Sequence, residues 1–97
     1  MTVDEFKQLA DGELEGMPEA LRALSHDARG DWTAAHEWAQ KAETPEGAWV
    51  HAYLHRKEGD PGNAAYWYRR AGQPFPKSSV EAEWEQIAGA LLLRGAS

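Results

Sequence analysis

The sequence predicts an all-α fold of stacked antiparallel helical hairpins, closed at the C-terminal end by a capping helix. The main observation is an internal repeat: the pattern Gly-Asp-x-x-x-Ala-x-x-Trp-x-x-x-Ala occurs at residues 30–42 and returns 29 residues later at 59–71. A fixed period of this size indicates an array of helical hairpins. In addition, no segment alternates apolar and polar residues as a strand does, and the connections within each repeat are short enough to require antiparallel neighbours.

The signals at helix ends place the first three helices. Thr2, with a glutamate three residues later, forms a capping-box pattern, and Asp11-Gly12 ends this first helix. The second helix starts at Pro18, which suits a first helical position, and stops at Gly30. Asp31 caps a third helix that continues to the end of the first repeat.

The second repeat uses the same signals. Thr44-Pro45-Glu46 combines a cap, a proline and a first-turn acid, and it opens a fourth helix that Gly59 closes. Asp60-Pro61 opens a fifth helix that stops at Gly72. The two predicted hairpins are therefore residues 18–42 and 45–71. Four small residues are expected at close contacts between their helices, namely Ala23, Ala35, Ala52 and Ala64.

A loop and a final helix complete the predicted fold. Residues 73–77 contain two prolines, which exclude a helix there. Ser78 and the glutamate three residues later form another capping box, and the sixth helix is expected over 79–94. A terminal helix with one polar face would close the exposed end of a repeat array. The face expected to be polar carries Glu81, Glu83 and Glu85.

Length and composition limit the class of protein. We expect a single domain over residues 1–97, since a chain of this length can bury a modest core. The absence of cysteine excludes disulfides and thiolate metal sites, and it fits a reducing, cytoplasmic setting. Because the N-terminus is acidic and no long apolar run occurs, we expect neither a signal peptide nor a membrane span. The net charge of −6 argues against binding to nucleic acid.

The repeated pattern resembles the second half of a tetratricopeptide repeat, and the resemblance covers roughly residues 18–72. Ala23 and Ala52 stand where that repeat places a small residue on its first helix. The period of 29 departs from the usual value of about 34 residues. Residues 51–72 also resemble a small bacterial family of uncharacterised proteins, a resemblance that implies no activity.

The tetratricopeptide resemblance implies a groove, lined by the first helix of each hairpin, that binds a peptide or a protein surface. On the fourth helix the groove-facing positions would be Trp49, Tyr53, Arg56 and Lys57. Aromatic rings beside two cations suit an acidic segment. Two further cations face outward on the fifth helix and complete the predicted partner site, Arg69 and Arg70. The alternative is that Trp49 and Tyr53 pack under the first or the sixth helix.

The histidines suggest a second kind of site. His51 and His55 lie four residues apart on one helix face, as paired metal ligands do, and His26 occupies the repeat position of His55 one hairpin earlier. These three side chains could therefore hold a metal ion. The alternative is a buried histidine hydrogen-bonded across the hairpin to Asn63 or Tyr66.

No motif for catalysis stands out in this chain. There is no phosphate-binding glycine loop and no nucleophile elbow, and His51 lacks the following glutamate of the hydrolytic H-E-x-x-H pattern. We therefore expect no cofactor and no enzymatic activity. The favoured function is a protein-interaction module with a peptide or protein partner, and the alternative is a metal-binding protein or metal-dependent enzyme.

Overall fold

A computed structural model describes residues 1–95 of the chain, and this part is all-helical, with no strand. A short 3-10 helix, η1, accompanies six α-helices. Their bounds are α1 Val3–Lys7, η1 Asp11–Leu14, α2 Glu19–Ala28, α3 Trp32–Lys41, α4 Pro45–Lys57, α5 Pro61–Ala71 and α6 Val80–Gly95. In the described residues, no helix is both long and apolar enough to cross a bilayer.

The Gly-Asp pair of each repeat forms the turn between two packed helices. Gly30 and Gly59 have φ values of +82° and +89°, a region that side-chain-bearing residues rarely adopt. The amide of Asp31 donates to the carbonyl of His26 at 3.0 Å, and 29 residues later the amide of Asp60 donates to that of His55 at 2.9 Å. The same turn chemistry therefore ends both α2 and α4.

The aspartate of each pair then starts the next helix. A carboxylate oxygen of Asp31 accepts from the Ala34 amide at 3.0 Å, and one of Asp60 accepts from the Asn63 amide at 3.3 Å. These bonds satisfy amides that the first turn of a helix leaves without a partner. Both predicted helix starts are confirmed.

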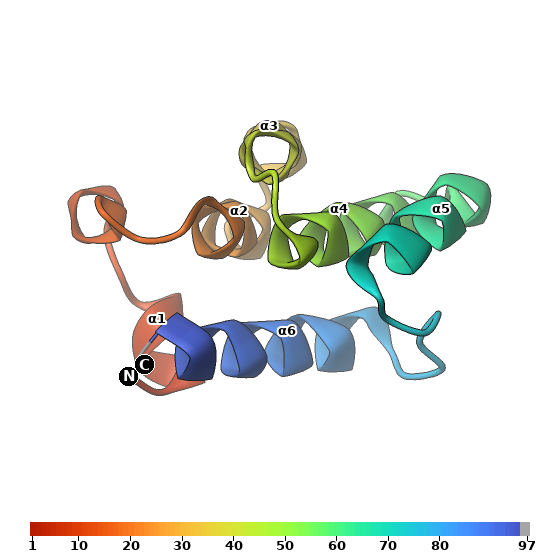
Figure 1. The fold of residues 1–97 in the computed structure, drawn as a ribbon. Helices are drawn as coiled ribbons and strands as arrows, with labels where there is room; N and C mark the ends of the chain where they lie inside the picture. The colour runs from red at the N-terminus through yellow and green to blue at the C-terminus, as the bar shows by residue number, and fades with distance from the viewer. Residues whose placement is uncertain (96–97) are drawn as a thin grey trace.

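The helices form two hairpins that pack side by side. α2 packs against α3, α4 packs against α5, and α3 joins the two pairs by packing against α4. Figure 1 shows α6 running along one side of α2 and α4, with α3 on the opposite side. α1 lies against one end of α6. The final helix therefore covers the face of the first helices of the two hairpins.

The core lies between α6 and the hairpins. All four predicted contact alanines are fully buried: Ala23, Ala35, Ala52 and Ala64. From α6, Ile87 and Leu91 enter the same cluster, and the indole Nε1 of Trp84 donates to the carbonyl of Leu24 at 3.1 Å. Burial of this apolar surface holds α6 against the hairpins.

Two expectations about local structure are wrong. The first helix ends at Lys7, and the chain then forms η1, which inserts Leu14 into the core. On α6, Glu81 and Glu85 are exposed, but Glu83 is buried. Glu83 lies four residues before Ile87 and so shares the apolar stripe of the helix.

Candidate metal centre

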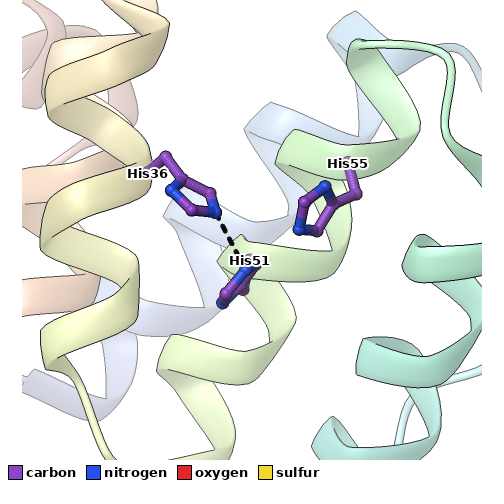
Figure 2. A group of neighbouring side chains, drawn as sticks. All are labelled: His36, His51 and His55. Atoms are coloured by element: carbon purple, nitrogen blue, oxygen red, sulfur yellow. Dashed lines mark hydrogen bonds between the residues drawn. The ribbon is translucent and has the colours of Figure 1, made fainter.

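Three histidine side chains meet on the side of α4 that faces α3 and α5. His36 comes from the middle of α3, and His51 and His55 lie one turn apart on α4 (Figure 2). Each offers one ring nitrogen, and these three nitrogens all lie within 4.8 Å of one another. His51 and His55 are buried, whereas His36 is half-buried and borders the solvent.

Two indole rings hold the imidazoles in place. His36 stacks on Trp32 with ring centres 4.9 Å apart, and His51 stacks on Trp67 with ring centres 3.9 Å apart. The Trp32 ring is itself fixed, because its Nε1 donates to the Leu54 carbonyl at 3.1 Å. The two tryptophans therefore form apolar walls of the cluster.

The closest pair of nitrogens belongs to different hairpins. Nε2 of His36 lies 3.1 Å from Nε2 of His51, which is drawn as the dashed line in Figure 2. Two nitrogens bound to one tetrahedral zinc ion would be about 3.3 Å apart, given Zn–N bonds of about 2.0–2.1 Å. The observed separation therefore suits either a hydrogen bond between a donor and an acceptor ring or chelation of one ion.

His55 is oriented by a carboxylate. Its Nδ1 lies 2.6 Å from Oε1 of Glu58 one turn later on the chain. When Nδ1–H donates to Glu58, the lone pair of the second ring nitrogen, Nε2, is available to a ligand. Carboxylates in this position fix the ring and increase the basicity of metal-binding histidines.

Burial disfavours the protonated form of two of the three imidazoles, those of His51 and His36. Burial, and after it the neighbouring charges of His36 and His55, lowers the pKa of His51 to about 4. Burial and His55 also lower the pKa of His36, although Glu58 and Glu37 act in the opposite direction. Neutral imidazole is the form that binds metals.

A second group of potential ligands overlaps with the first. His55, Glu58 and Asp60 also offer atoms within 4.8 Å of one another. However, the two carboxylate oxygens of Asp60 accept hydrogen bonds from the amide and the side chain of Asn63 at 3.3 and 2.9 Å. Because the α5 cap already uses Asp60, the three-histidine group is the better candidate.

The sequence pointed to two members of the centre and to a different third histidine. His26 lies on α2 and does not belong to either ligand group found in the described residues, and His51 contacts His36 rather than Asn63 or Tyr66. The missed residue is His36. The sequence did contain an indication of its place. His36 follows Trp32 by four residues and so shares its helix face, and α3 has to contact both α2 and α4.

The aromatic and basic residues of α4 lie mainly beneath α6. Trp49 is buried. The Tyr53 hydroxyl donates to Asp27 at 2.6 Å, and Lys57 donates to the other carboxylate oxygen of Asp27 at 2.9 Å. Burial, and in addition the hydrogen bond to Asp27, raises the pKa of Tyr53. Arg56 pairs with Glu83 of α6 at 2.9 Å and also donates to the carbonyl of Ser78. Because Arg56 is already paired with Glu83, it is not available to an acidic partner while α6 stays docked.

The two cations of α5, Arg69 and Arg70, are exposed. The guanidinium carbon of Arg70 lies 5.0 Å from the ring centre of Trp67, and an Nη of Arg70 donates to the Tyr66 hydroxyl at 2.9 Å. Arg70 is therefore close to the wall of the histidine cluster.

Comparison of the chain with protein-family models, curated proteins and solved structures finds no match.

Proposed function

We propose that this protein binds a divalent transition-metal ion through His36, His51 and His55. The observation that carries the proposal is the convergence of three imidazoles within 4.8 Å from two helices. Imidazole ligands suit zinc, nickel and copper, whereas manganese and magnesium prefer oxygen ligands. Three protein ligands leave a fourth position for water or another small ligand, as in catalytic zinc sites.

The surroundings of the cluster support metal binding in two ways. The lowered pKa of His51 means that no proton has to leave this ring before a metal binds at neutral pH. Glu58 supplies the outer-shell carboxylate, and its negative charge offsets part of the charge that the ion would bring.

The test uses protein purified without a histidine tag. We expect one zinc or nickel ion per chain by elemental analysis. At a metal concentration about 100 times the Kd, binding stabilises the fold by about 2.7 kcal/mol, which raises Tm by roughly 11–20 °C in a domain of this size. Manganese should cause little shift. His36→Ala, and the double variant His51→Ala with His55→Ala, should abolish the effect.

His26→Ala is the matched control, because His26 is half-buried on α2 but lies outside the cluster. It should bind metal as the wild type does. If the untagged wild type neither retains nor takes up zinc or nickel, or if His26→Ala loses the metal as His36→Ala does, the proposal is wrong.

We also propose that the two hairpins are a divergent tetratricopeptide array. The support is the identical cap chemistry at Gly30-Asp31 and Gly59-Asp60. A peptide partner stays the second hypothesis, and it now depends on Arg69 and Arg70, whose side chains are exposed. Recovery of one partner from host lysate by wild type, and its loss in Arg69→Glu with Arg70→Glu, would support this hypothesis.

A further inference from the structure

A groove of about 480 Å³ lies beside the histidine cluster and runs along the start of α4. It lies between the end of α3, the first turns of α4, and α5, and its lining includes Gln40, Thr44 and Ala48. His51 and Trp67, which belong to the cluster, line the groove as well. Its volume is in the range of sites that hold small molecules. Of the three histidines, His51 alone lines the groove, so a ligand on the metal would extend into this space beside the His51 ring.

Arg70 lines the same groove and holds its guanidinium in a fixed place. It lies over the Trp67 ring and is hydrogen-bonded to Tyr66, and in the part of the chain that the structure describes it has no carboxylate partner. A guanidinium that stacks on an aromatic ring still presents donors that fit a carboxylate in its plane.

Trp67 sets the distance between the two ends of the groove. Its ring centre is 3.9 Å from that of His51 and 5.0 Å from the Arg70 guanidinium carbon. Together these distances place the guanidinium carbon of Arg70 no more than 8.9 Å from the centre of the His51 ring. A molecule with a few carbon atoms between two functional groups can span this separation.

We infer that the groove binds a small dicarboxylic acid. One carboxylate would bind the open position of the metal, and the other would bind the guanidinium of Arg70. This inference rests on the proposed metal site. The metal and Arg70 are both cationic, so a dianion with charges at its two ends fits the groove. Glu43, an exposed residue that also lines the groove, acts against such a ligand through like-charge repulsion.

The test uses the full chain loaded with cobalt(II), whose visible absorption reports on ligands of the ion. Acetate can reach only the metal, whereas succinate can also reach Arg70. We expect both acids to change the spectrum and succinate to bind at least 10-fold more tightly than acetate. Arg70→Gln should remove this advantage and leave acetate affinity unchanged, and Arg70→Lys should retain part of it. Glu43→Gln should increase succinate affinity.

Arg69→Gln is the control for the loss of one positive charge, since Arg69 is exposed on α5 and is not among the groove residues. It should bind succinate as the wild type does. Cobalt affinity is measured first for each variant. If cobalt binds normally but succinate is no tighter than acetate, or Arg70→Gln leaves succinate affinity intact, the inference is wrong and the metal site stands. If cobalt does not bind to the wild type, both fail.

Discussion

The phenol oxygen of Tyr68 lies 2.6 and 2.8 Å from the two carboxylate oxygens of Glu83, and an Nη of Arg56 lies 2.9 Å from one of them. Glu83 is 1% exposed. The three residues come from α6, α5 and α4, so that one buried carboxylate joins the final helix to the second hairpin. Burial and the contact with Glu83 raise the pKa of Tyr68, which stays a donor.

Removing this carboxylate should destabilise the protein strongly. We expect Glu83→Ala to lower the free energy of unfolding by about 3 kcal/mol, because the change leaves Arg56 without its partner in a largely buried place. Tyr68→Phe, which keeps the ion pair, should lower it by about 1–2 kcal/mol. Urea unfolding measures both. Glu81→Ala on the exposed face of α6 is the control and should change it by less than about 0.5 kcal/mol.

Acid should weaken the fold through His51. Its pKa is about 4 in the folded protein and near 6.5 in the unfolded chain, so the unfolded chain binds more protons between these values. The stabilising contribution is complete above about pH 6.5 and is lost as the pH falls toward 4. From pH 7.5 to 5.0, in metal-free buffer, the wild type should lose about 2 kcal/mol more than His51→Gln. An equal loss in urea melts would show that the ring is not held neutral.

Glu58 should increase the affinity for the metal without being one of its ligands. We expect Glu58→Gln to weaken zinc binding 10–100-fold, because the His55 ring loses the carboxylate that orients it. Competition with a chromophoric chelator gives the affinities. Glu81→Gln removes the same charge from α6, which lies on the opposite side of α4 from α3, and should leave zinc binding unchanged. Equal affinities for wild type and Glu58→Gln would argue against a role for this carboxylate.

Gly47 should tolerate no side chain. A Cβ atom there would overlap the carbonyl oxygen of Ala42, which belongs to the backbone and cannot simply swing away. We expect Gly47→Ala to lower the free energy of unfolding by about 1–3 kcal/mol. Gly62→Ala is the matched change, since the new Cβ would meet only an ordinary 3.9 Å contact with Asp60. It should raise the unfolding free energy by up to about 1 kcal/mol, and the opposite order would contradict the packing at Gly47.

Local signals predicted the helices well because caps depend on neighbouring residues. Asp31 and Asp60 start their helices by accepting hydrogen bonds from backbone amides three residues later, an interaction that can be predicted from the local sequence alone. The repeat also predicted the burial of Ala35 and Ala64.

Contacts between distant helices were predicted less well. Glu83 was expected on the polar face, because its charge suggested solvent and the sequence does not show that Arg56 and Tyr68 would reach it. His36 was missed for the same reason. His51 and His55 are neighbours on one helix, whereas His36 meets them only after the two hairpins have packed together.

The repeat also shows how one position can change its chemistry. His51 stacks on Trp67 in the second hairpin, and 29 residues earlier Arg22 lies over Trp38, with its guanidinium carbon 3.9 Å from the ring centre. The same place on the scaffold thus carries a permanent cation in one hairpin and a titratable ring in the other.

The three-histidine centre belongs to the junction between two hairpins rather than to either one. His36 comes from the second helix of the leading hairpin, and the counterpart of this position in the following hairpin is Ala65. If a further hairpin of the second type were appended to the array, it would bring its own pair of histidines, but Ala65 could not supply a third ligand. Under the proposed metal binding, the capacity per chain would thus stay at one ion however many such hairpins were added.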